Sequence, residues 1–131
     1  MNKSLKKKRK ILIIEDEKVL RDLIEERFTQ RGFEVFASID GDDGFQKIIK
    51  LKPDLIFLDI ILPGKSGFDI LKDLKVALKK DFNKLKIIIL SNLGQEDDIN
   101  KAKAFGVLDY LIKANITVSD IEKKARKYLS L

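Results

Sequence analysis

The chain has 131 residues, of which 44% are hydrophobic, so it can bury one core but has no room for a second domain. It contains no cysteine and no histidine, which excludes disulfides, imidazole ligands for a metal and catalysis by imidazole. The 27 Lys and Arg residues exceed the 21 Asp and Glu residues, and a net charge of +6 is also typical of proteins that bind nucleic acids or membranes.

The positive charge is concentrated at the N-terminus. The first ten residues include six basic residues and no acid, whereas the remaining 121 contain 21 basic and 21 acidic residues and are neutral. We therefore predict a disordered basic tail over residues 1–9 and a single domain over residues 10–131. The tail either contacts the phosphates of nucleic acid or lipid, or only aids solubility.

No segment of the sequence is suited to a membrane. The run "ILII" after the basic residues is shorter than the roughly 7–15 apolar residues of a signal peptide, and no other run approaches the length of a membrane span. Because the chain also lacks cysteine, we expect a cytoplasmic protein with no membrane span.

Five short apolar runs alternate with longer amphipathic stretches along the chain. The runs are about six residues long and favour β-branched residues, as buried strands do; they cover residues 10–15, 33–38, 54–59, 85–90 and 107–112. Apolar residues at helical spacing follow each run, and we expect these groups to face the core: Leu20, Leu23, Ile24 and Phe28; Phe45, Ile48 and Ile49; Leu71, Leu74 and Leu78; Ile99, Ala102 and Phe105; Val118, Ile121 and Ala125. This alternation predicts an α/β domain with a five-stranded, doubly wound parallel sheet and helices on both faces.

Polar residues stand at the carboxyl ends of these runs, which is the edge where doubly wound sheets bind ligands. Asp59, in "IFLDI", is costly to bury unless it is paired, hydrogen-bonded or metal-bound, although it could also simply end its strand. If Glu15 and Asp16 converge on it, three carboxylates form an oxygen site suited to Mg²⁺. Ser91 and Lys113, each also common as surface residues, would add the hydroxyl and the cation that a phosphoryl group requires.

The motifs "ILIIEDE", "DLIFLDIILPGKSG", "IIILSN" and "DYLIK" together resemble the receiver domain of bacterial two-component response regulators, over residues 10 to about 129. This resemblance implies a flavodoxin-like strand order of 2-1-3-4-5. It implies that Asp59 is the phosphoacceptor, which takes a phosphoryl group from a phosphohistidine of a sensor histidine kinase or a phosphotransfer protein. Asp16 and Asp59 would hold Mg²⁺ directly, Glu15 would support it mostly through water, and the backbone carbonyl of Ile61 would complete the protein ligands.

The resemblance also implies a switch. Lys113 would pair with the phosphoryl group, and Ser91 would move to donate its hydroxyl to it. Tyr110 would then turn inward and change the surface made by the fourth helix, fifth strand and fifth helix, where a downstream protein binds. A half-buried strand aromatic is the alternative interpretation of Tyr110. On this interpretation the chain is not an enzyme, since it catalyses only its own phosphorylation and dephosphorylation.

Several positions depart from the family pattern. Ile61 and Leu93, two residues beyond Asp59 and Ser91, are apolar where polar groups can help to position a hydrolytic water. Ala114 stands where the family usually has a proline after the lysine, so the Lys113–Ala114 peptide bond is left open as cis or trans, and with it the placement of Lys113. Asn92 stands where the family usually has a small residue, and it could crowd the entrance to the site.

Two alternative functions remain. A phosphohydrolase of the haloacid-dehalogenase type would need a second Asp two residues after Asp59, where this chain has Ile61. A nucleic-acid-binding protein would depend on the tail. We expect no DNA-binding domain in this chain, and we favour a stand-alone receiver over an excised part of a longer protein.

Overall fold

The computed structural model describes residues 7–131. Its strands are β1 (Lys10–Ile14), β2 (Glu34–Ser38), β3 (Leu55–Leu58), β4 (Ile87–Ser91) and β5 (Asp109–Ile112). Its helices are α1 (Lys18–Gln30), α2 (Gly41–Leu51), α3 (Gly67–Leu78), α4 (Glu96–Ala104) and α5 (Val118–Tyr128), with short 3₁₀ helices η2 (Lys79–Lys84) and η3 (Lys113–Asn115). All five predicted strands and all five predicted helices are present, while the two 3₁₀ helices η2 and η3 were not predicted.

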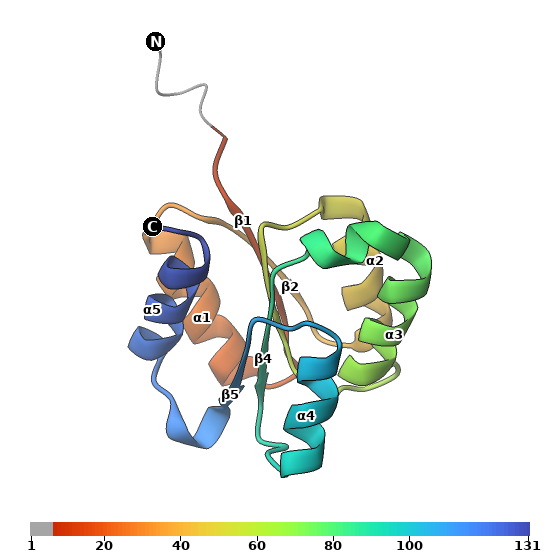
Figure 1. Ribbon diagram of the computed structural model, residues 1–131. Coiled ribbons are helices and arrows are strands. Elements are labelled where there is room, and N and C mark those ends of the chain that lie inside the picture. The colour runs from red at the N-terminus through yellow and green to blue at the C-terminus, as the bar shows by residue number, and fades with distance from the viewer. Residues whose placement is uncertain (1–6) are drawn as a thin grey trace.

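The strands form one parallel sheet in the order β2-β1-β3-β4-β5, which confirms the predicted doubly wound topology. Helices α1 and α5 cover one face of the sheet, and α2, α3 and α4 cover the other (Figure 1). Successive side chains of a strand point to opposite faces, so Ile11 and Ile13 pack toward α1 and α5 while Leu12 and Ile14 pack toward the other three helices. A central strand between two helical layers must therefore be apolar at every position.

Two residues predicted to face the core are exposed instead. Leu23 on α1 is 49% exposed and Ile49 on α2 is 37% exposed, so the prediction was wrong for both. Each lies at the border of its helix's apolar stripe, and the neighbouring Ile24 and Ile48 take the buried positions.

The first six residues of the predicted basic tail lie outside the described residues. Arg9 is attached to the domain: its guanidinium donates a hydrogen bond to the Leu129 carbonyl (2.9 Å), and its own carbonyl accepts one from the Glu34 amide (2.9 Å). The division between tail and domain at residue 10 stays a prediction.

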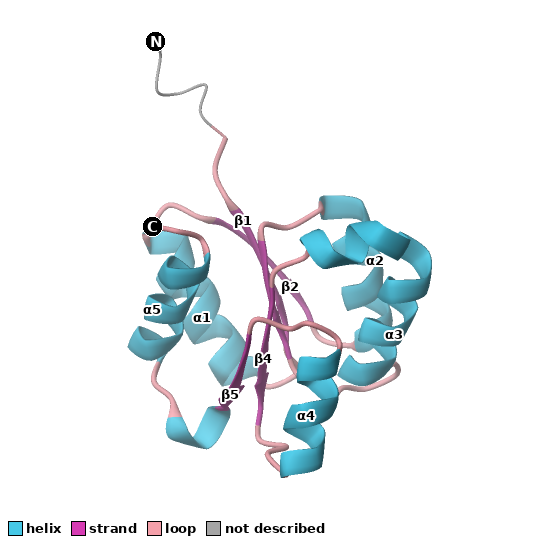
Figure 2. Cartoon of the chain, viewed as in Figure 1, coloured by secondary structure: helices cyan, strands magenta, loops and turns pink. Residues whose placement is uncertain are grey.

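The strand register positions the residues of the site. Ile14 of β1 is paired with Leu58 of β3, so the next residues, Glu15 and Asp59, leave the sheet side by side. Ser91, the last residue of β4, is paired with Ile112 of β5, directly before Lys113. The loops after β4 and β5 emerge at the same edge (Figure 2).

Candidate functional site

Three carboxylates meet at the carboxyl edge of the sheet. One carboxylate oxygen from each of Glu15, Asp16 and Asp59 lies within 4.8 Å of the other two. Glu15 and Asp59 are buried, with 1% and 4% of their surface exposed, and Asp16 is exposed. Two buried carboxylates this close repel each other unless a cation offsets their charge.

Lys113 supplies a positive charge between the two buried acids. Its Nζ lies 2.6 Å from Oδ2 of Asp59 and 2.7 Å from Oε1 of Glu15, and a third carboxylate, that of Glu17, lies 3.3 Å away. Only 7% of the lysine side chain is exposed. Burial acts to lower the pKa of Lys113, but hydrogen bonds and charge attraction from Asp59 and Glu15 outweigh it and raise that pKa above its ordinary value.

For Glu15, burial has a larger effect on the pKa than the nearby hydrogen bonds and charges. Burial raises the pKa of Glu15 above its ordinary value, and the Lys113 ammonium and the Glu17 amide only partly counteract this effect. Burial therefore disfavours the charged form of Glu15, and a further cation at this edge would favour it.

Backbone groups fix the two loops that carry the acids. The Glu17 amide donates to Oε2 of Glu15 (3.0 Å), and the Ile61 amide donates to Oδ1 of Asp59 (3.2 Å). The guanidinium of Arg21 donates to the carbonyls of Glu15 (3.0 Å) and Asp16 (3.2 Å), which ties the first loop to α1. The acids are held in place before any ligand arrives.

The donor set fits a hard divalent cation. It consists of carboxylate oxygens from two adjacent strand ends, the ligand chemistry that Mg²⁺ prefers. Glu15, Asp16 and Asp59 could therefore hold a metal ion.

The turn after Asp59 is packed against the acid's own backbone. Gly64 has φ of +71°, a conformation that favours glycine. A Cβ on Gly67 would lie 2.4 Å from the carbonyl oxygen of Asp59, so only glycine lets α3 begin this close to the acid. The "PGKSG" segment thus has a steric reason for both glycines.

Ser91 and Tyr110 are joined through the loop after β4. Ser91 is fully buried, and its Oγ accepts a hydrogen bond from the Leu93 amide (3.2 Å). The Tyr110 hydroxyl donates to the Leu93 carbonyl, and its half-buried ring packs on the core. Burial, with the charges of Asp98 and Asp59, raises the pKa of Tyr110 to about 12, so the phenol stays a neutral donor at physiological pH.

The Lys113–Ala114 peptide bond is trans, as is every other peptide bond of residues 7–131. Lys113 nevertheless reaches Asp59, so the departure at Ala114 does not displace the lysine. The Ala114 amide is bonded by the side chain of Asn92 (2.9 Å).

Three contributors were not found from the sequence: Glu17, Arg21 and the carboxamide of Asn92. The only signal for the first is the third acid in "EDE", and for Arg21 it is a basic residue one turn after that motif. Neither pattern says where the side chain points.

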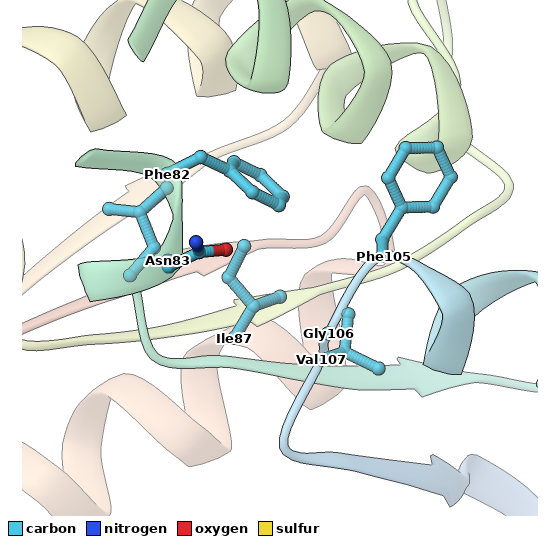
Figure 3. A pocket seen from close by; sticks show the side chains of 7 residues that line it. Phe82, Asn83, Ile87, Phe105, Gly106 and Val107 are labelled. Atoms are coloured by element: carbon cyan, nitrogen blue, oxygen red, sulfur yellow. The ribbon is translucent and has the colours of Figure 1, made fainter. Parts of the chain in front are cut away.

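A small hollow lies at the other end of the sheet. It has a volume of about 50 Å³ and lies between the rings of Phe82 and Phe105, beside Ile87, the first residue of β4 (Figure 3). Asn83 is its only polar side chain, so it offers neither a nucleophile nor a cation. This hollow therefore offers no candidate chemistry.

A doubly wound sheet that buries an aspartate beside two further acids and a lysine is the arrangement expected of a receiver-type signalling domain. A family model described as response regulator receiver domain matches residues 11–126. Sporulation initiation phosphotransferase F of Bacillus subtilis (strain 168) is 34% identical over 122 residues, which cover 93% of this chain and 94% of that protein.

Solved structures agree. The BeF3-activated N-terminal receiver domain of Klebsiella pneumoniae RstA has a TM-score of 0.80 and 27% identity, over 94% of this chain and 100% of that chain. A response regulator receiver domain protein from Methanospirillum hungatei JF-1 has the same fold, with a TM-score of 0.84 and 22% identity over 95% of each chain.

The chain belongs to the response regulator receiver domain family and is a phosphoacceptor signalling module of the two-component type. Members of this family interact with histidine kinases or phosphotransfer proteins. The membership does not favour the phosphohydrolase or the nucleic-acid alternative. Among residues 7–131, no helix is long and apolar enough to cross a bilayer.

Proposed function

We propose that Asp59 accepts the phosphoryl group, from a phosphohistidine of a sensor histidine kinase or a phosphotransfer protein. An oxygen of Asp59 attacks the phosphorus, the bond between phosphorus and the imidazole nitrogen breaks, and the imidazole stays with the donor protein. The observation that carries this proposal is the buried Asp59 carboxylate held 2.6 Å from the Lys113 ammonium at the ligand-binding edge of the sheet.

Mg²⁺ is the metal that we propose for the acidic cluster, with Asp16 and Asp59 as direct ligands. Glu15 supports it mostly through water, and the Ile61 carbonyl completes the protein ligands. When bound, the ion offsets negative charge on the phosphoryl oxygens as they approach the carboxylates.

Lys113 and Ser91 are proposed to contact the phosphoryl group. The Lys113 ammonium already neutralises Asp59, so after transfer it can pair with phosphoryl oxygens without entering from solvent. Ser91 is buried at the end of the neighbouring strand, and because its Oγ only accepts a hydrogen bond from the Leu93 amide, its hydroxyl proton can be donated to the phosphoryl group.

The proposed output surface is made by α4, β5 and α5. The Tyr110 hydroxyl is bonded to the Leu93 carbonyl, so a shift of the loop between Ser91 and α4 changes what holds Tyr110 on β5. A downstream protein that binds this surface would sense phosphorylation through that contact.

The donor protein is proposed to dock beside α1. Val19 is 75% exposed, and with Leu23 it lines a groove of about 320 Å³ that also reaches Lys113 and Ala114. A phosphohistidine must come within bonding distance of Asp59, so its protein must cover loops at this edge, and exposed apolar residues there suit a protein partner.

The chain is proposed to act only on itself, by its own phosphorylation and dephosphorylation, and not as an enzyme for other substrates. The residue two positions after Asp59 is Ile61, which cannot serve as a second acid. A cytoplasmic location stays a prediction.

The test is labelling by a small phosphodonor. Incubation of the protein with Mg²⁺ and acetyl phosphate should add one phosphoryl group by intact mass. Asp59→Asn should fold but remain unlabelled, because the amide is nearly isosteric yet cannot act as the nucleophile. Asp97→Asn, an exposed substitution in the first turn of α4, is the matched control and should be labelled like wild type. An unlabelled wild type, or a labelled Asp59→Asn, contradicts the proposal.

A further inference from the structure

One hydrogen bond joins the two loops that leave β4 and β5. The side-chain oxygen of Asn92 accepts from the backbone amide of Ala114 at 2.9 Å. Because a backbone N–H can only donate, the carboxamide must present its oxygen to it. The β4–β5 ladder ends at the pair Ser91 and Ile112. The Asn92 side chain therefore continues the connection between the strands beyond the last backbone pair.

The bond connects the residues that flank the site. Asn92 directly follows Ser91, and Ala114 directly follows Lys113. Asn92 is the only side chain of the described residues that bonds the Ala114 amide, while Lys113 itself reaches its acids through a flexible four-carbon side chain. The position of the Lys113 backbone therefore decides whether its ammonium stays between Asp59 and Glu15.

Two of the unusual positions, Asn92 and Ala114, depend on each other. Ala114 has an N–H that a proline would lack, and Asn92 has the acceptor for it. Without Asn92 this amide would rely on solvent, and the connection between the two strands would end at the pair of Ser91 and Ile112.

We propose that Asn92 is a positioning residue that holds the Lys113–Ala114 segment to β4, so that Ser91 and Lys113 approach Asp59 as one unit. This role in phosphorylation rests on the function proposed for Asp59. Asn92 does not touch the acidic cluster in the structure, and it acts through the Ala114 amide. A small residue at position 92 and a proline at position 114, as the family usually has, could not form this bond between the two loops.

The first measurement does not involve phosphorylation. In wild type Lys113 is buried among acids, so an acylating reagent should modify it more slowly than exposed lysines, as read by peptide mass mapping. Asn92→Ala should raise Lys113 modification about fivefold, the effect expected for loss of one hydrogen bond. Asn92→Asp, which keeps an acceptor oxygen, should restore slow modification, and Asn115→Ala, an exposed asparagine of the same loop, should change nothing.

The second measurement is a double-mutant cycle with Ala114→Pro, which removes the donor. As a single substitution, Asn92→Ala should slow labelling by acetyl phosphate about fivefold. Added to Ala114→Pro, it should slow labelling no further. It should not raise the Mg²⁺ concentration needed for half-maximal labelling, because the acids are not moved and a displaced Lys113 competes less with the ion. A merely structural role would change stability but not this pattern.

The outcomes separate the two proposals. If acetyl phosphate fails to label wild type, the function proposed for Asp59 is wrong, while Lys113 acylation still decides the role of Asn92. Unchanged Lys113 acylation in Asn92→Ala overturns the positioning role, and so does a full effect of Asn92→Ala in the Ala114→Pro background. If Ala114→Pro does not fold, the comparison of Asn92→Ala with Asn92→Asp gives the same decision.

Discussion

At the carboxyl ends of β1 and β3 the chain buries two acids, Glu15 and Asp59, whereas at the amino ends of the same strands its polar groups stay exposed. There Asp54 accepts a hydrogen bond from the Lys10 amide at 2.7 Å in an exposed contact. That end is closed by apolar packing around Phe82, which is 5% exposed. One end of the sheet is thus stabilised by apolar burial, and the other tolerates buried charge.

The difference shows where a receiver can place its chemistry. Buried carboxylates are tolerated at one edge because Lys113 offsets their charge within 2.7 Å. The apolar end compensates for the stability that such a site costs. Changes at the two ends should therefore have separable effects on stability and on labelling.

The largest effect on stability should come from the apolar end. Phe82→Ala removes a buried ring beside a hollow of about 50 Å³ and should destabilise the fold by about 3–5 kcal/mol, since the cavity grows. Urea unfolding measures this loss. Acetyl phosphate labelling, assayed where the variant is folded, should stay normal. Asn83→Ala, its exposed neighbour, should stay within about 0.5 kcal/mol of wild type. Impaired labelling in folded Phe82→Ala would show that the two ends are coupled.

The next effect concerns the cation at the acidic end. Lys113→Ala leaves Asp59 and Glu15 buried without their partner and should cost about 3 kcal/mol without metal, the lower end for a broken buried ion pair. Mg²⁺ should recover part of the loss, because it replaces the missing positive charge. Lys103→Ala, an exposed lysine on α4, is the control. Equal losses with and without Mg²⁺ would mean that charge is not what Lys113 contributes.

Much of the fold could be predicted because each apolar run is a strand buried on both faces. Parallel strands align their carboxyl ends, so residues directly after β1, β3 and β5 could be expected to meet, as Asp59 and Lys113 do. Leu23 and Ile49 were misplaced because helical spacing predicts an apolar stripe wider than the buried strip.

The supporting contacts could not be predicted in this way. Arg21 reaches the carbonyl groups of Glu15 and Asp16 across a loop whose shape no periodicity describes. The Asn92 bond to Ala114 lies beyond the end of the sheet, where strand register no longer fixes neighbours. Such contacts depend on side-chain direction, which the sequence pattern does not contain.

A smaller effect should come from the metal. At ten times its Kd, Mg²⁺ should stabilise the wild type by about 1.4 kcal/mol, because it binds only the folded cluster. Asp16→Ala should abolish this gain and should slightly stabilise the metal-free protein by removing one of three neighbouring acids. Thermal melts with and without Mg²⁺ test both effects. Asp97→Ala should keep the full gain. If Mg²⁺ raised the melting temperature of Asp16→Ala as much as that of wild type, the metal would bind at a site other than this cluster.

The smallest effect should be a pH dependence at Glu15. Burial raises the pKa of Glu15 above its ordinary 4.5, so the folded chain binds this proton more tightly than the unfolded chain. Stability contributed by Glu15 is therefore lost as pH rises from 4.5 through the raised pKa. Glu15→Gln has no charge to bury, and Asp59 still pairs with Lys113.

Without metal, Glu15→Gln should therefore match wild type below pH 4.5 and exceed its melting temperature near neutral pH by about 1–3 °C. Glu96→Gln, an exposed acid at the start of α4, should show no such trend. Saturating Mg²⁺ should reverse the order near neutral pH, because only the wild type gains from the ion through all three acids. If Glu15→Gln raised the melting temperature equally at pH 4 and pH 7, its effect would come from packing. The buried charge of Glu15 would then not explain the difference between the two ends of the sheet.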